Sequence, residues 1–144
     1  MRRAIEWLCA ILLAVVFLAA CIPKIASPHD FAVAVFRYQI LPHGLINLAA
    51  IYLPWLELVS AVALLAPGWR RGAAWILFAM LAVFAAAMAF NLARGVNVSC
   101  GCFSVGEDAA VSGWWNVARN IALMAAALVV LRAPGKKPAD PQPA

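Results

Sequence analysis

The sequence predicts an all-α protein, a four-helix transmembrane bundle with a short interfacial helix between spans 1 and 2. Hydrophobic residues make up 67% of the 144 residues and charged residues only 12%, far from the composition of a soluble domain. Four apolar runs, at about residues 4–22, 44–66, 72–93 and 114–131, match the roughly 20 residues that a membrane-spanning helix needs. We therefore expect a single membrane domain over residues 1–132, followed by a disordered tail, 133–144.

The positive charges predict the orientation of these spans. Seven Lys and Arg residues lie on the side of both termini, and four lie on or near the other side: Arg2, Arg3, Arg70, Arg71, Arg132, Lys136 and Lys137 against Lys24, Arg37, Arg94 and Arg119. Because cytoplasmic segments carry an excess of Lys and Arg, both termini are predicted to be cytoplasmic in a bacterial inner membrane. This topology, with anionic lipid at the inner face, accounts for the net charge of +5, so no nucleic-acid partner is expected.

The first span allows two interpretations. Leu18-Ala19-Ala20-Cys21 resembles a bacterial lipobox, at which the chain would be cleaved and Cys21 lipidated. Glu6 interrupts the proposed signal core, however, and the residues after Cys21 do not form a flexible polar tether. We expect the segment to be retained, with Pro23 ending the first helix just after Cys21.

The segment between the first two spans predicts a short amphipathic helix in the outer interface. Pro28 suits a first helical turn, and apolar residues then recur at helical spacing before Pro42: Phe31, Val35, Tyr38 and Leu41. Such a helix could form a lid or platform, or it could be a packed connector.

The later spans combine packing signals with a few polar residues. Glu57 follows Pro54 and lies about 20 Å into the second span, where an ionisable group is a functional candidate. It could be a protonated hydrogen-bonding residue that locks helix packing, or a proton carrier. Alanines at four-residue spacing in the third and fourth spans indicate close helix packing. The outer turns of three spans carry polar residues, among them Arg94, Arg119 and Asn120. We predict that these residues form a hydrogen-bonding floor below the cysteine loop.

The sequence Ser99-Cys100-Gly101-Cys102-Phe103 occupies the polar gap between the last two spans, in the predicted periplasmic loop 94–113. Gly101 permits the tight backbone of a small disulfide ring, and a strained bridge is more easily reduced. Arg94 and Arg119 are nearby cations that favour the thiolate. A structural bridge and two buried free thiols remain alternatives. Metal binding by these cysteines with His29 or His43 is disfavoured because the paired-cysteine zinc spacing is absent, so we predict no metal site.

Taken together, these motifs resemble the MauE family of methylamine-utilisation membrane proteins, within the wider DoxX-like group. The resemblance covers about residues 20–125 and is carried by Lys24-Ile25, Pro28, Phe31 to Tyr38, Leu41-Pro42, Leu53 to Glu57, Arg94-Gly95, Cys100 to Phe103, Trp115 and Arg119-Asn120. It implies a four-helix membrane protein associated with thiol redox and with maturation of methylamine dehydrogenase. A thioredoxin-like periplasmic partner and a disulfide-containing client are implied in the same way. Ser104 departs from the glycine expected after Phe103.

Two function classes follow from these observations. In the first, Cys100 and Cys102 exchange disulfides with the partner and Cys21 is a candidate third thiol, whereas Cys9, 12 residues away, lies too far along the helix to relay. Gly101, Phe103, Arg94, Arg119, Asn120 and Glu57 would support this site. In a variant, a quinone accepts the electrons, which requires an apolar cleft near Cys21 or the loop. The second class is a non-catalytic membrane scaffold of a maturation complex, in which a Cys100–Cys102 bridge only shapes the docking loop.

Overall fold

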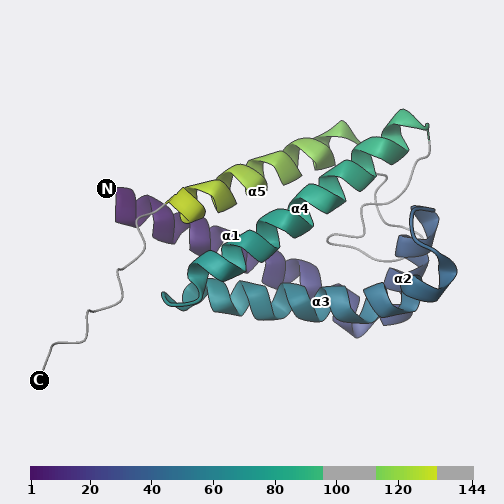
Figure 1. The fold of residues 1–144 in the computed structure, drawn as a ribbon, viewed down its shortest axis with the longest axis horizontal. Coiled ribbons are helices and arrows are strands. Elements are labelled where there is room, and N and C mark those ends of the chain that lie inside the picture. Colours follow the sequence, from purple (N-terminus) through teal and green to yellow (C-terminus); the bar gives the residue numbers. More distant parts are fainter. Residues whose placement is uncertain (96–112, 133–144) are drawn as a thin grey trace, which may run out of the picture.

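The computed structural model describes residues 1–95 and 113–132, all of them in five helices and their connections. The helices are α1 (Arg2–Ala26), α2 (Pro28–Arg37), α3 (His43–Leu65), α4 (Arg70–Ala93) and α5 (Trp114–Arg132). Figure 1 shows four long helices, with the short α2 at one end. The predicted fold class is confirmed: α1, α3, α4 and α5 are each long and apolar enough to cross a membrane, and α2 lies between the first two of them.

The hydrophobic core lies where the four long helices meet. Its fully buried members include Leu13, Leu64 and Leu77, from α1, α3 and α4, together with Ala127 of α5. Many other large apolar side chains point outward, as expected where lipid surrounds the bundle. Alanine is frequent in the core, which lets the helices approach closely. Several of the alanines at four-residue spacing in the last two spans, Ala86, Ala118 and Ala122 among them, are instead exposed.

The two ends of the bundle can be distinguished by α2. The helix α2 packs mainly on α3, and the carboxyl end of α4 reaches the same end, where Asn91 Nδ2 of α4 donates to the carbonyl oxygen of Tyr38 at 3.4 Å. We call this the α2 end. The N-terminus, the α3–α4 turn and the carboxyl end of α5 lie at the opposite end (Figure 1).

The expectation that Pro23 ends the first helix is wrong. The helix α1 continues for another turn to Ala26, and the backbone N–H of Ser27 donates to the carbonyl oxygen of Pro23 at 3.0 Å. Proline removes one helical hydrogen bond but is tolerated in membrane helices when neighbouring structure holds the chain. Here the turn after Pro23 is held by Lys24, whose side chain is bonded to α3.

The short helix α2 begins where the sequence predicted. Ser27 precedes it and Pro28 occupies its first turn, while Phe31 and Ala34 are its buried residues. It ends at Arg37, earlier than the apolar spacing indicated, and Gln39 then adopts a positive φ of 51°. A left-handed backbone at this point lets the chain turn toward Pro42 and enter α3.

A buried arginine clip fastens the opposite end of the bundle. Arg70, at the start of α4, is only 5% exposed, and its guanidinium carbon lies 3.7 Å from the ring centroid of Trp7 in α1. Its Nε donates to the carbonyl oxygen of Leu64 at 3.0 Å, and its Nη1 donates to Glu6 at 3.1 Å. Arg70 therefore ties α1, α3 and α4 together instead of only facing the surface.

Candidate functional site

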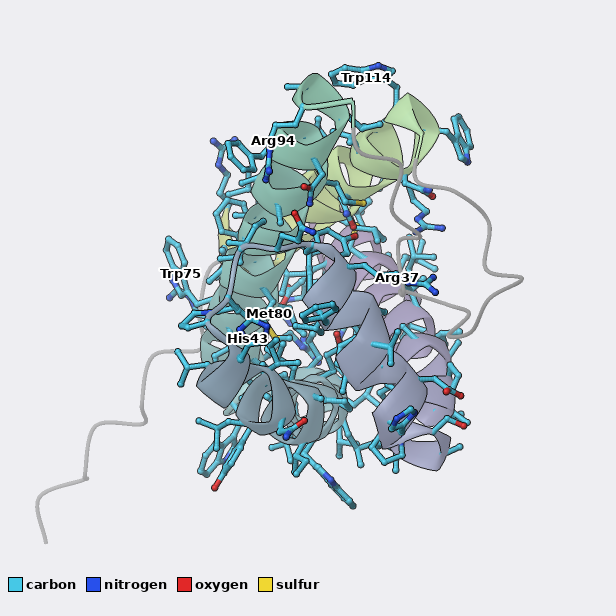
Figure 2. The ribbon with its side chains drawn as sticks, turned by 90° about the vertical axis from the view of Figure 1, so that its right-hand side faces the viewer. Arg37, His43, Trp75, Met80, Arg94 and Trp114 are labelled. Carbon is cyan, nitrogen blue, oxygen red and sulfur yellow. The ribbon has the colours of Figure 1, made fainter. Side chains whose placement is uncertain are left out.

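The predicted loop cysteines lie outside the described residues. This applies to Cys100, Gly101, Cys102 and Phe103, so their predicted roles stay predictions. The described residues on either side are placed, however: Figure 2, which views the molecule from the α2 end, shows Arg94 at the end of α4 and Trp114 at the start of α5. The two helix ends that flank the cysteine sequence, the carboxyl end of α4 and the start of α5, therefore both lie at the α2 end.

Arg94 is exposed at the carboxyl end of α4. Its guanidinium carbon lies 5.2 Å from the ring centroid of Phe90, one turn earlier in the same helix. Trp114 and Trp115 are also largely exposed, and tryptophans are enriched where membrane helices meet the water interface. Arg94 is not among the residues that line the cavity described below, whereas Glu57 and Arg119 are.

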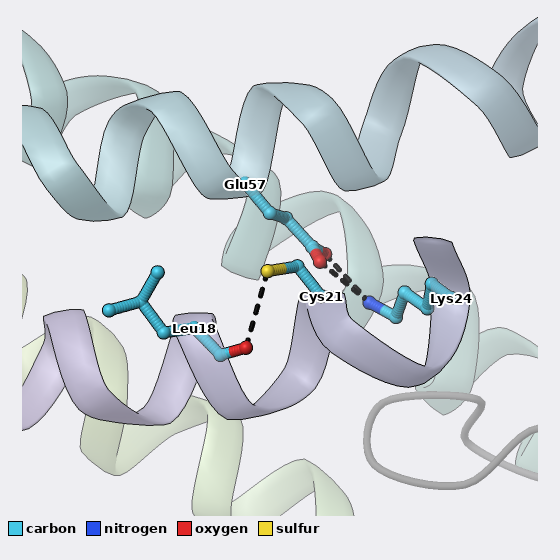
Figure 3. Close-up of polar contacts among 4 residues, drawn as sticks. All are labelled: Leu18, Cys21, Lys24 and Glu57. Carbon is cyan, nitrogen blue, oxygen red and sulfur yellow. Dashed lines mark hydrogen bonds and ion pairs between the residues drawn. The ribbon is translucent and has the colours of Figure 1, made fainter. Parts of the chain in front are cut away.

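Cys21 is buried inside the bundle, near the α2 end of α1. It is 1% exposed, and its Sγ donates to the carbonyl oxygen of Leu18 at 3.2 Å (Figure 3). The carboxylate of Glu57 lies on the α3 side of the same region (Figure 3). Cys21 and Cys9 are both free thiols in the described part of the chain, and Cys9 is half-buried. A buried thiol can take part in exchange only if the bundle opens or the partner sulfur enters it.

Beside Cys21 lies a buried ion pair between α1 and α3. Lys24 Nζ donates to both carboxylate oxygens of Glu57, at 2.7 and 2.9 Å (Figure 3). The side chains are 3% and 1% exposed. Of the two roles proposed for Glu57, the packing role fits this geometry, because its side chain is held by a partner on another helix. The contact is an ion pair with Lys24, however, and not the hydrogen bond of a protonated carboxyl that was expected.

Sequence reasoning missed Lys24 as the partner of Glu57. Lys24 entered the sequence argument only as an outer positive charge and as part of the family motif. A carboxylate deep in a span needs a cation or a donor, and Lys24 is the basic residue nearest to the end of the first span, which was the available signal. The assumption that the helix ended at Pro23 placed Lys24 outside the bundle.

Two aromatic rings surround the Lys24 ammonium. Its Nζ lies 5.1 Å from the ring centroid of Phe31 in α2 and 5.5 Å from that of Phe84 in α4. Such cation–π contacts stabilise an ammonium that has left water. Lys24 therefore connects α1 with α2, α3 and α4.

A small cavity adjoins the ion pair where α1, α3, α4 and α5 meet. Its volume is about 30 Å³, and its polar lining consists of Lys24, Glu57, Arg119 and Asn120. Three of the predicted supporting residues, Glu57, Arg119 and Asn120, are thus brought together from two helices. Apolar side chains form the rest of the wall, Leu81 and Phe84 among them.

A larger apolar cleft lies between α2, α3 and α4. It has a volume of about 160 Å³, and its wall includes the four residues whose spacing predicted the amphipathic helix: Phe31, Val35, Tyr38 and Leu41. Val83, which is largely exposed, places part of the cleft at the outer surface of α4. Phe31 and Phe84 border the cleft and also contact Lys24, so these two aromatic side chains connect the cleft to the ion pair.

Comparison with known proteins places this arrangement in a family. The sequence profile of the family described as methylamine utilisation protein MauE matches residues 2–133. The chain is 37% identical over 126 residues to the methylamine utilization protein MauE of Methylophilus methylotrophus, which covers 87% of this chain and 66% of that protein. It is 38% identical over 125 residues to the protein of the same name from Paracoccus denitrificans, covering 86% of this chain and 67% of that protein.

The matched region spans about two thirds of the length of these relatives. No solved structure matches the chain. The family profile extends over all five helices, including the residues of the ion pair and of both cavities. This chain is a member of the MauE family, whose named relatives serve methylamine utilisation.

Proposed function

We propose that this chain is an inner-membrane component of thiol–disulfide exchange in protein maturation, with Cys100 and Cys102 as the exchanging pair. On this proposal both termini are cytoplasmic and the cysteine segment faces the periplasm. The partner is a thioredoxin-like periplasmic protein, and the client is a disulfide-containing protein such as the methylamine dehydrogenase small subunit. Gly101 and Phe103 shape the exchanging loop.

One observation carries the proposal. The Cys100-Gly101-Cys102 sequence joins α4 to α5, whose adjoining ends lie at the α2 end of the bundle, and Cys21 lies near that same end of α1. Cys21 and the two helix ends that flank the Cys100-Gly101-Cys102 sequence therefore lie at one end of the bundle. Family membership supports the client pathway, because methylamine utilisation is the process named for the relatives.

The exchange step is balanced within the protein and its partner. A thiolate of reduced partner attacks one sulfur of the Cys100–Cys102 disulfide, and a mixed disulfide forms as the other cysteine leaves as thiolate. The second thiolate of the partner then attacks the mixed disulfide. The partner ends oxidised, the cysteine pair ends reduced, and two electrons have moved. Run in reverse, the same steps reduce the partner.

The test is client maturation in cells that carry single cysteine variants. Cys100→Ser and Cys102→Ser should each leave the protein inserted and abundant but block disulfide formation in the client. One of the two variants should trap a mixed disulfide with the partner, visible on a non-reducing gel. Cys9→Ser is the matched control and should be silent. Full maturation with both loop cysteines replaced would reject exchange and favour the scaffold, in which the bridge only shapes the loop.

The apolar cleft favours a second candidate, a quinone-linked thiol oxidase. Its volume of about 160 Å³ is close to the ~150 Å³ of a cavity that holds a benzene ring. In this variant the Cys100 and Cys102 thiols deliver two electrons and two protons to a quinone, which leaves as quinol. Reduced protein in detergent would then convert a soluble short-chain quinone to quinol, and Ala87→Phe, which fills the cleft, would abolish the conversion while partner exchange continues.

A further inference from the structure

The cavity beside the ion pair contains one buried polar group that the protein itself does not satisfy. Asn120 of α5 is 3% exposed, and its Nδ2 has no hydrogen-bond partner among the residues that the structure describes. Asn120 lines the cavity together with Lys24 and Glu57. Buried amides are almost always hydrogen-bonded, because leaving a donor unpaired away from water is costly.

The size and lining of the cavity suit water. Its volume of about 30 Å³ exceeds the ~10–15 Å³ that one water molecule requires, and a buried water needs two to four polar partners. The wall offers the amide donor of Asn120, the carboxylate of Glu57 and the ammonium of Lys24. Two of the three Lys24 donors are directed to Glu57, and the Glu57 oxygens keep lone pairs for a further donor.

We propose that this cavity is a binding site for ordered water, in which a water molecule accepts a hydrogen bond from Asn120 Nδ2 and donates one to the Glu57 carboxylate. The site belongs to the bundle itself and does not depend on thiol exchange.

The water joins two helices that are otherwise separate. In the described part of the chain, α3 and α5 do not pack directly against each other, although each packs on α1 and α4. A water between Asn120 and Glu57 supplies a polar connection across this gap. It thereby couples α5, the helix that follows the loop containing Cys100 and Cys102, to the Lys24–Glu57 pair.

Radiolytic footprinting of the folded wild-type protein tests for this water. Hydroxyl radicals made from a trapped water oxidise the side chains that touch it, so Leu81, which lines the cavity, should be oxidised several-fold faster than Leu77. Leu77 is the matched control, because it is the same residue one turn away on α4 and belongs to the same apolar core, but it does not line the cavity. Leu77 is 0% exposed and Leu81 is 3% exposed. Equal rates at Leu81 and Leu77 would mean that the cavity is dry and the proposal wrong.

Paired variants separate the water bridge from ordinary packing. In the wild-type background, Asn120→Leu should lower the melting temperature and also slow the hydroxyl-radical oxidation of Leu81. In a Lys24→Leu/Glu57→Leu background, which lacks the Glu57 acceptor of the proposed bridge, the same change should leave the melting temperature unchanged or raise it. If Asn120→Leu lowers the melting temperature equally in the two backgrounds, the proposed water bridge is wrong.

An ion is the competing occupant. A melting temperature that rises with chloride or bromide, and stops doing so in Asn120→Leu, would assign the cavity to a halide and contradict the proposal. If Asn120→Leu does not fold, the halide titration and the comparison of Leu81 with Leu77 in the wild-type protein still decide between water, halide and a dry cavity.

Discussion

Removing one member of the Lys24–Glu57 pair should destabilise the bundle far more than removing both. Lys24→Met deletes both hydrogen bonds to Glu57, at 2.7 and 2.9 Å, and leaves a carboxylate whose side chain is 1% exposed. Hydrogen bonds between membrane helices average about 0.6 kcal/mol and reach about 1.7, so the two bonds set a lower bound of roughly 1 kcal/mol. Breaking a buried pair by removing one partner costs about 3–5 kcal/mol, because the remaining charge has no counter-ion.

We therefore expect Lys24→Met to lower the free energy of unfolding by about 3 kcal/mol, roughly a hundredfold in the folding equilibrium. Glu57→Gln, which keeps the shape and leaves Lys24 unpaired, should behave similarly. The double variant Lys24→Met/Glu57→Met removes both charges and should recover most of this loss, because apolar replacement of a buried ion pair is often neutral.

Equilibrium unfolding by steric trapping in bicelles measures these free energies without removing the bilayer. Cys9→Ser serves as a control at a half-buried position on the same helix. Two outcomes would refute the argument: single variants within about 0.5 kcal/mol of wild type, the range of ordinary surface substitutions, or a double variant at least as unstable as the sum of the singles.

Three further predictions concern other parts of the chain. Arg70→Ala should cost about 2 kcal/mol in the same assay, because it removes the Trp7 stacking and the hydrogen bonds of a buried guanidinium; a loss indistinguishable from zero would show that the clip is unimportant. Cys21→Ser should fold with a loss of less than about 1 kcal/mol, since a hydroxyl can still donate to the carbonyl that the thiol now bonds, so any block in client maturation would reflect the missing sulfur. Reporter fusions should place residue 70 in the cytoplasm and residue 100 in the periplasm, and either one on the other side would overturn the proposed topology.

The fold was predictable because its signal is strong and simple. Four long apolar runs can hardly be anything but membrane helices, and Pro28 with the following apolar spacing indicated α2. The end of α1 was not predictable in the same way. Pro23 is a local signal against a helix, whereas the bond from Lys24 to α3 that holds the last turn is a tertiary contact.

The candidate site was predicted only in part for a related reason. Glu57 was identified because a carboxylate at membrane depth is rare, but a single sequence does not show which cation approaches it. Arg70 was counted only among the cytoplasmic charges that set the topology, and its burial depends on Trp7, which is distant in sequence. Asn120 was predicted to face the cysteine loop, and the structure places it in the interior beside Glu57.

The ion pair also bears on how the helices assemble during membrane insertion. Lys24 is synthesised first and lies near the end of α1, where a long flexible side chain can reach the headgroup region while the helix is alone in the bilayer. Glu57 arrives later, in the middle of α3, and its short side chain cannot reach water from there. Docking of the newly inserted α3 on α1 gives this side chain its lysine partner, so an ionisable group stays unpaired in lipid until the two helices meet. Correct pairing thus removes a feature by which membrane quality control can recognise an unassembled helix.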